Sequence, residues 1–187
     1  MLATSASCHA VHFYRTLDGL GDTVARFIAD GLAVGQPGVV IVRPEVWPHI
    51  ERGLLAHGIE VDDAIARHRL VRLDAATVLE QILSDGRPDP AKARKALESI
   101  LGRVENASKD GTTRFYGEMA GMLWGSGRRV AALELEELGN ASPGHCMVVC
   151  GYCAADMPER SADDDICAFH SHVLSATGEL TASRWHE

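Results

Sequence analysis

The sequence predicts an α/β protein: a three-layer sandwich with a mostly parallel central sheet and a short C-terminal extension. Two observations predict this fold. Short runs of β-branched and aromatic residues alternate with longer segments in which apolar residues recur every three or four positions. Strands separated by helices favour crossover connections, which place helices on both faces of a parallel sheet. A chain of 187 residues is long enough to bury one sizeable core.

Five runs have the character of buried parallel strands, because they are short, mostly apolar and rich in β-branched or aromatic residues. They cover residues 9–14, 38–42, 70–73, 113–116 and 146–150. Because the ligand crevice of an open α/β sheet lies at the carboxyl ends of its strands, the residues that follow these runs are candidates for a binding site.

Helical periodicity fills the segments between the strands, at residues 20–32, 93–104 and 130–138. Asp89 followed by Pro90 is typical of a helix start, and Asp74 is placed to cap a helix over 75–83. Another helix is expected between Pro44 and Gly58.

The chain becomes polar after about residue 156, where MPERSADDD predicts a loop. A last short helix is expected over 164–170, and the tail is expected to add an edge strand or to reach a neighbouring molecule. We therefore expect an α/β domain over residues 1–155 and a C-terminal helix and tail over 156–187 that pack on the same domain or extend it.

Composition narrows the class of protein. The formal net charge of −8 and the lack of a Lys/Arg run disfavour a nucleic-acid partner. No stretch approaches the roughly 20 apolar residues of a membrane span, so no membrane association is expected. The N-terminal segment lacks the pattern of a secretory signal, which predicts a cytoplasmic location and five reduced cysteines.

The loop after the first strand, RTLDGLGDT, is where a nucleotide-binding protein of this class would hold phosphate. Gly19 and Gly21 are present, but the Lys–Ser/Thr pair of a phosphate-binding loop is not. Without the lysine and the hydroxyl that holds the metal ion, ATP hydrolysis is not expected.

Glu118 follows the fourth strand in RFYGEMAGMLWGSG, beside a nearly all-apolar segment. One interpretation is an acid that faces a ligand in the crevice. The other is a carboxylate at a helix N-terminus, which the helix dipole stabilises. The sequence favours the helix-start interpretation.

Cysteine and histidine residues near the C-terminus have a spacing compatible with tetrahedral zinc. Because strand residues three apart point to opposite faces, a metal shared within CGYC is disfavoured, and Cys150 is expected to act as a small apolar residue. We therefore expect no metal; zinc or haem is kept as an alternative. The alternative ligands are Cys150, Cys153, Cys167 and His170.

Three other patterns have simple structural explanations. His9 and His12 should point to opposite faces of the first strand; the simple interpretation is core histidines, and the alternative is that one of them faces the crevice. Glu136 and Glu137 are interpreted as a solvated helix face. No Ser-His-Asp spacing identifies a nucleophile, so catalytic residues are not assigned.

Several blocks resemble the MEDS domain, the sensory domain of the methanogen and methylotroph DcmR type. They are HFYRTLDGLGDTVARFIADGLAVGQPGVVIVRPE, GRPDP, RFYGEMAGMLWGSGRRVAALELEEL, VVCGY and ICAFHSHV. The resemblance extends over most of the chain, and its GEM hallmark falls on Gly117, Glu118 and Met119. The sequence departs from the family at Cys153, where proline is typical, and after the LEEL helix.

The resemblance implies a RecA/KaiC-like fold that has lost its ATP loop, and a sensory role in signal transduction. Such domains look like input modules of histidine kinases or transcription regulators and are proposed to sense small organic compounds. We therefore expect a non-catalytic module that binds a small organic ligand at Tyr14, Arg43, Glu118 and Trp124. A signalling partner and a homodimer are expected as well. The alternatives are a metal or haem sensor and an enzyme with Glu118 as base.

Overall fold

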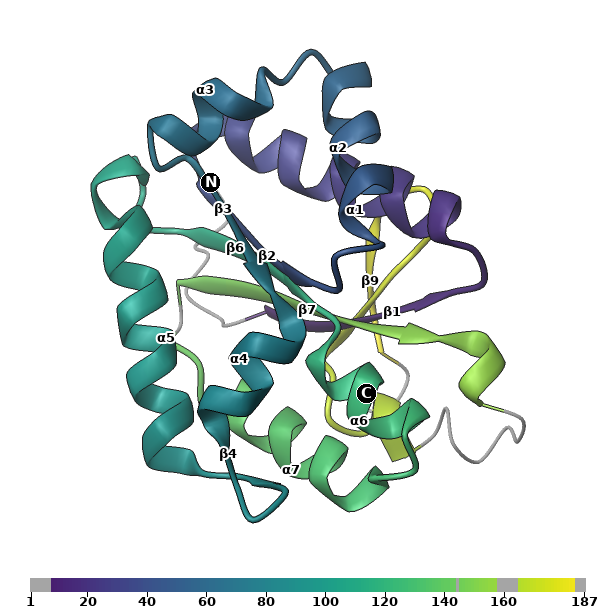
Figure 1. Cartoon of the computed structure of the whole chain (residues 1–187). Coiled ribbons are helices and arrows are strands. Elements are labelled where there is room, and N and C mark those ends of the chain that lie inside the picture. Colours follow the sequence, from purple (N-terminus) through teal and green to yellow (C-terminus); the bar gives the residue numbers. More distant parts are fainter. Residues whose placement is uncertain (1–7, 144, 158–164, 184–187) are drawn as a thin grey trace.

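The computed structural model describes residues 8–143, 145–157 and 165–183, which surround a seven-stranded sheet (Figure 1). The strand order is β3-β2-β6-β7-β1-β8-β9. Every neighbouring pair is parallel except β8 with β9. The strands are β1 (Cys8–Tyr14), β2 (Gly38–Val42), β3 (Leu70–Asp74), β6 (Thr113–Gly117), β7 (Cys146–Cys153), β8 (His172–Leu174) and β9 (Leu180–Ala182). The predicted α/β class and mostly parallel central sheet are confirmed.

Helices cover both faces of this sheet and complete three layers (Figure 1). One face carries α1 (Leu17–Val34), α2 (Trp47–Ala56) and α3 (Val61–Ala66), and the other carries α4 (Ala75–Ile82), α5 (Pro90–Val104), α6 (Met119–Gly125) and α7 (Arg129–Asn140). Side chains alternate along each strand. Val40 packs with α1 and α2, whereas its neighbour Val39 packs with the opposite layer. The sheet is therefore apolar on both faces, as its continuous apolar runs predict.

The starts of three helices follow from local hydrogen bonding. The hydroxyl of Thr16 accepts a bond from the Gly19 N–H at the start of α1. The Asp74 carboxylate accepts from the Thr77 N–H at the start of α4, and Asp89 accepts from two N–H groups at the start of α5. The two predicted aspartate caps are confirmed, because each side chain satisfies N–H groups that the first turn leaves free.

The structure also contains elements that the periodicity did not predict. β4 (Leu83–Ser84) and β5 (Arg87–Pro88) form a small antiparallel hairpin. Its two turn residues, Asp85 and Gly86, both have positive φ angles, as a tight two-residue hairpin turn requires. Short helical segments α3, η1 (Glu105–Ala107) and η2 (Ala154–Asp156) were likewise not expected.

The C-terminal part extends the same sheet, because β8 pairs with β1 and β9 pairs with β8. The expected edge strand is therefore present. The predicted helix over 164–170 is shorter, with helical backbone at 165–167 followed by a turn. Most of the predicted polar loop, residues 158–164, lies outside the described residues. No described helix is long and apolar enough to cross a membrane.

Candidate functional site

Two hollows and one buried polar cluster are the candidate sites of the described chain. The first hollow, the strand-end crevice, has a volume of about 520 Å³ and lies where β1, β2, β6 and β7 end. It is lined by Tyr14, Arg15, Thr16, Leu17, Arg43, Glu118, Gly121, Met122, Gly125, Gly151, Cys153 and Asp156. A hollow therefore lies at the carboxyl ends of the strands, where the sequence analysis predicts a crevice.

Glu118 is held by two groups from other strand ends. Its Oε1 accepts hydrogen bonds from the Tyr14 hydroxyl at 2.9 Å and from Arg43 Nη2 at 3.0 Å. Its Oε2 accepts from the Arg43 backbone N–H at 3.2 Å. Glu118 occupies the N-cap position of α6, but its side chain makes no capping hydrogen bond. The carboxylate thus joins three strand ends instead of capping its own helix.

The arrangement shifts the pKa values of both partners. Burial and the Glu118 carboxylate raise the pKa of the Tyr14 hydroxyl, so that it stays protonated and donates its hydrogen bond. Burial lowers the pKa of Arg43, but the hydrogen bond to Glu118 and its charge outweigh that effect and raise the pKa. The result is a charge-assisted group in which each carboxylate oxygen has a donor.

Trp124 lies away from this group. It is 4% exposed and belongs to the apolar layer beneath the sheet, where its ring packs against Tyr152 and under the Arg129 guanidinium. Of the four expected ligand-contacting residues, the structure brings Tyr14, Arg43 and Glu118 together and places Trp124 apart. The reason is helical geometry: Trp124 lies six positions after Glu118, the N-cap residue of α6, so the two point in different directions.

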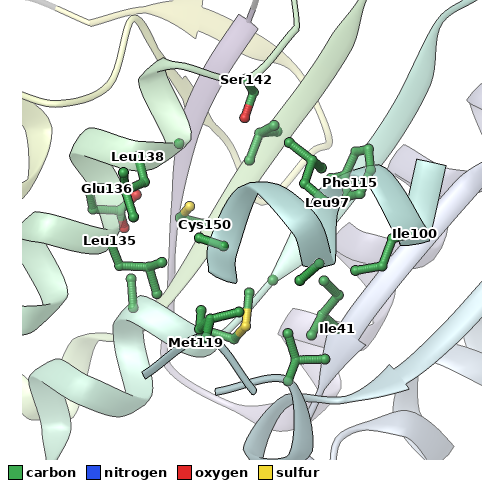
Figure 2. Close-up of a pocket in the computed structure, with 18 of the residues that line it drawn as sticks. Ile41, Leu97, Ile100, Phe115, Met119, Leu135, Glu136, Leu138, Ser142 and Cys150 are labelled. Carbon is green, nitrogen blue, oxygen red and sulfur yellow. The ribbon is translucent and has the colours of Figure 1, made fainter. Parts of the chain in front are cut away.

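The second hollow, the apolar cavity, has a volume of about 140 Å³ and lies between the sheet and helices α4 to α7 (Figure 2). Most lining side chains are aliphatic or aromatic, and they include Ile41, Val78, Ile82, Ala93, Ala96, Leu97, Ile100, Phe115, Met119 and Leu135. Glu136 of α7 and Cys150 of β7 also line it. Figure 2 shows both away from Ile100, so the cavity has one apolar end and one polar end.

The polar end belongs to a cluster of four side chains, which we call the His–Glu–Cys cluster: His9 of β1, Glu136 of α7, Cys150 of β7 and His170 before β8. One nitrogen, oxygen or sulfur atom from each lies within 4.8 Å of the others. His9, Glu136 and His170 are 4%, 1% and 0% exposed. Four elements that are distant in sequence therefore place polar groups at one buried point.

Glu136 is the centre of this cluster. Its Oε2 lies 3.1 Å from His9 Nε2 and 3.3 Å from His170 Nε2, and its Oε1 accepts a 2.5 Å hydrogen bond from the Tyr152 hydroxyl. Burial raises its pKa, but His170 and His9 lower it more, so the carboxylate is ionised. The interpretation of Glu136 as part of a solvated helix face was wrong; only Glu137 is exposed.

The Glu136 carboxylate also shifts the pKa values of His9 and Cys150. Burial lowers the pKa of His9, but the hydrogen bonds and charge supplied mainly by Glu136 raise it above its usual value. Burial first, and Glu136 second, raise the pKa of the Cys150 thiol well above its usual value. Cys150 Sγ lies 3.4 Å from His9 Nε2. His12 points to the opposite face of β1, toward the Tyr116 hydroxyl, as strand alternation predicts.

The sequence signal for this cluster was present but weak. Ala132 and Glu136 are four residues apart on α7, and both are buried, so the acid continues the buried side of the helix. His9 belongs to an otherwise buried strand. Their convergence with His170 depends on pairing of β1 with β7 and β8, which separations of more than a hundred residues do not reveal.

Only two of the four residues expected as an alternative metal site lie close together in the structure. Cys150 and His170 belong to the cluster, whereas Cys153 lines the strand-end crevice. Cys167 is half-buried and packs beside the apolar layer. All five cysteines are free of disulfide bonds.

The fold and these sites define an α/β domain with an apolar cavity between its parallel sheet and helices α4 to α7. Comparison with protein families then identifies the chain: residues 8–171 match the family described as MEDS, MEthanogen/methylotroph, DcmR Sensory domain. The chain belongs to this family of sensory domains. A search of curated proteins found no match.

Proposed function

We propose that this protein is a non-catalytic sensory module that binds a small organic molecule and passes its bound state to a signalling partner. The partner would be a histidine kinase or a transcription regulator in the cytoplasm. Membership of a sensory-domain family supports the role. The observation that carries the proposal is the apolar cavity beneath the sheet.

The size of the cavity indicates the class of ligand. Its volume of about 140 Å³ is close to that of cavities of roughly 150 Å³ that stay dry and bind benzene or xenon in other proteins. The lining is mostly aliphatic and aromatic, and the polar atoms come mainly from Glu136, Ser142 and Cys150. We therefore infer a ligand of a few heavy atoms, with an apolar body and at most one polar group.

Ligand binding in this cavity can change the protein surface through α5, which contacts both. Ala93, Ala96, Leu97 and Ile100 line the cavity from one side of this helix, while Glu98 and the Arg94 side chain are exposed on the other. A ligand that binds one position of α5 better than another shifts the population of that position. The exposed side of α5 is accordingly the surface that we expect a partner to read.

Nucleotide binding is disfavoured by the connection between β1 and α1. Only Arg15 and Thr16 lie between the end of β1 and the start of α1. A phosphate-binding loop of the G-x-x-x-x-G-K-[ST] type needs a longer turn and a lysine. This short connection supports the expectation that the domain has no ATP-binding loop.

The strand-end crevice is the second location that we consider for the ligand. Its polar lining suits a molecule with hydrogen-bonding groups, but the Glu118 oxygens already have donors from Tyr14 and Arg43. A ligand that used Glu118 would have to displace one of these bonds. For this reason the apolar cavity is favoured for a small organic molecule.

Two blocking variants distinguish the locations. Ala96→Phe fills the apolar cavity, and Leu17→Trp places bulk in the strand-end crevice. Ligand-observed NMR with benzene, dichloromethane and short-chain alcohols measures binding to the wild type and to each variant. We expect binding that Ala96→Phe abolishes and Leu17→Trp preserves. The reverse pattern moves the site to the crevice, and no binding by the folded wild type to any probe contradicts the proposal.

A further inference from the structure

The His–Glu–Cys cluster has features that a set of ordinary core residues does not require. A buried polar atom normally has a hydrogen-bond partner. His170 Nε2 is fully buried and makes no hydrogen bond within the described part of the chain, although Glu136 Oε2 lies 3.3 Å away in an unsuitable direction. This buried nitrogen therefore faces the Glu136 carboxylate at ion-pair distance without making a well-directed hydrogen bond to it.

Both imidazoles are held so that the same nitrogen faces the cluster. His170 Nδ1 lies 2.7 Å from the Ile166 carbonyl oxygen, and His9 Nδ1 lies 3.2 Å from the Phe169 carbonyl oxygen and 2.9 Å from Asn140 Oδ1. Because carbonyl oxygens only accept, each Nδ1 carries a proton and donates it. In a neutral imidazole the lone pair is then on Nε2. Metal-binding histidines are oriented by outer hydrogen bonds of this kind.

The spacing of the facing atoms suits one tetrahedral ion. Bonds of about 2.0–2.3 Å from zinc to nitrogen, oxygen and sulfur place neighbouring ligand atoms roughly 3.3–3.8 Å apart at tetrahedral angles. The observed separations are 3.1 Å for His9 Nε2 to Glu136 Oε2, 3.3 Å for His170 Nε2 to the same oxygen, and 3.4 Å for His9 Nε2 to Cys150 Sγ. Small side-chain rotations separate these atoms enough to admit an ion.

We propose that His9, Glu136, Cys150 and His170 bind a Zn²⁺ ion between β1, β7, α7 and the turn before β8. Zn²⁺ accepts this mixture of nitrogen, oxygen and sulfur ligands. Binding would convert the Cys150 thiol to a thiolate and release its proton to solvent, while the histidines bind as neutral imidazoles. Tyr152 would hold the carboxylate through its 2.5 Å hydrogen bond to Glu136 Oε1.

The proposed site adds to the sensory function without depending on it. Glu136 and Cys150 also line the apolar cavity, so the ion would sit at its polar end. The site also differs from the set that the sequence suggested, because His9 and Glu136 replace Cys153 and Cys167. The ion would tie the C-terminal turn to the sheet through His170, which lies two residues before β8.

Metal titration of the purified full-length protein tests the proposal. The protein is first treated with chelator, and Zn²⁺ is then added with the bound metal measured after gel filtration. We expect one equivalent of Zn²⁺ per chain. Co²⁺ in place of Zn²⁺ should give the visible bands of tetrahedral cobalt together with a thiolate-to-cobalt charge-transfer band.

Matched variants locate the site. Cys150→Ser should remove the charge-transfer band, and His9→Gln, His170→Gln and Glu136→Gln should each weaken Zn²⁺ binding at least about tenfold. The controls are Cys153→Ser on the same strand, His12→Gln on the opposite face of β1 and Glu137→Gln beside Glu136, and each should bind like the wild type. Because Glu136→Gln could fail to fold, Cys150→Ser and His170→Gln provide the decisive readings.

Three outcomes would overturn the proposal. The first is folded wild-type protein that binds less than one equivalent at micromolar Zn²⁺. The second is a charge-transfer band that persists in Cys150→Ser. The third is a band lost in Cys153→Ser, which would move the metal to the strand-end crevice. None of these outcomes affects binding of organic probes to the apolar cavity, so the two proposals fail separately.

Discussion

The Tyr14 hydroxyl donates a 2.9 Å hydrogen bond to Glu118 Oε1 and thereby joins the carboxyl ends of β1 and β6. These strands are not neighbours, since β7 lies between them. The bond therefore spans β7, whose Gly151 lines the same crevice. A side chain at Gly151 would collide with the Tyr116 hydroxyl. This link and the Arg43 contacts fix the edge of the sheet at which β1, β2 and β6 end.

Replacing Glu118 should destabilise the fold. Glu118→Gln removes the charge that Arg43 and Tyr14 satisfy, and the Glu118 side chain is 2% exposed. Because the Arg43 side chain is 32% exposed and keeps Glu45 as a partner, we expect a loss of about 1–3 kcal/mol in the free energy of unfolding, below the range for a fully buried pair. Urea unfolding measures it.

Glu45→Gln is the matched control for this change. Glu45 contacts the same guanidinium at 3.4 Å but is 59% exposed, so its loss should cost about 0–1 kcal/mol. Equal effects of the two substitutions would show that burial of Glu118 does not determine its contribution.

His12 should make stability fall in mild acid. Burial lowers its pKa from 6.5 to about 4, and the nearest polar group is the Tyr116 hydroxyl. The unfolded chain takes up a proton below pH 6.5, whereas the folded protein does so only near pH 4. The contribution of His12 is therefore complete above pH 6.5 and is lost as the pH falls toward 4, by at most about 3 kcal/mol.

Comparison with His12→Gln isolates this effect, because other titrating groups are common to both proteins. The free energies of unfolding are measured in urea at intervals from pH 7.5 to about pH 4. The wild type should lose stability relative to the variant across this range. A constant difference between the two would contradict a lowered pKa for His12.

Gly121 should not tolerate a side chain. An added Cβ would collide with the backbone carbonyl oxygen of Gly151, because α6 packs directly on β7 at this point. Backbone of a central strand cannot move aside without disturbing its neighbours, so Gly121→Ala should cost about 1–3 kcal/mol or more. Thermal and urea unfolding would record the loss.

The substitution Gly102→Ala is the matched control, and we expect it to stabilise the protein. Gly102 lies in α5, and nothing lies within 4 Å of an added Cβ. Alanine reduces the entropy lost on helix formation and should stabilise by roughly 0.5–1 kcal/mol. Destabilisation by both substitutions would mean that helix packing against β7 is not the cause at Gly121.

Zinc should stabilise the wild type selectively. An ion that binds the folded chain only, present at 100 times its dissociation constant, adds about 2.7 kcal/mol to the free energy of unfolding. We expect Zn²⁺ to raise the Tm of the wild type and of Cys153→Ser, and to leave that of Cys150→Ser nearly unchanged. Chelator should reverse the rise. A similar rise in Cys150→Ser would show binding elsewhere.

Much of the fold was predictable because it depends on local patterns. The strand at 38–42 and the caps at Asp74 and Asp89 were identified because short apolar runs and cap side chains act within a few residues. The hairpin at Asp85 and Gly86 was missed although its turn signal was present, since strands of two residues show no alternation.

The sites were less predictable. Tyr14, Arg43 and Glu118 were expected at the sheet edge because each ends or follows a parallel strand, and the structure brings them together. Trp124 was expected beside them, but the direction of α6 places it in the apolar layer. Glu136, which the sequence analysis interpreted as solvated, is instead a buried member of the His–Glu–Cys cluster.

The sequence by itself determined the α/β class, the order of its main elements and the family, whereas the loop expected over residues 15–23 proved to be mostly helix, since α1 begins at Leu17. Those features reside in residues that are near one another along the chain. Only the tertiary structure decided that His9, Glu136, Cys150 and His170 meet beside an apolar cavity. The physical reason is that parallel strands pair residues far apart in sequence, and β1 brings His9 between β7 and β8.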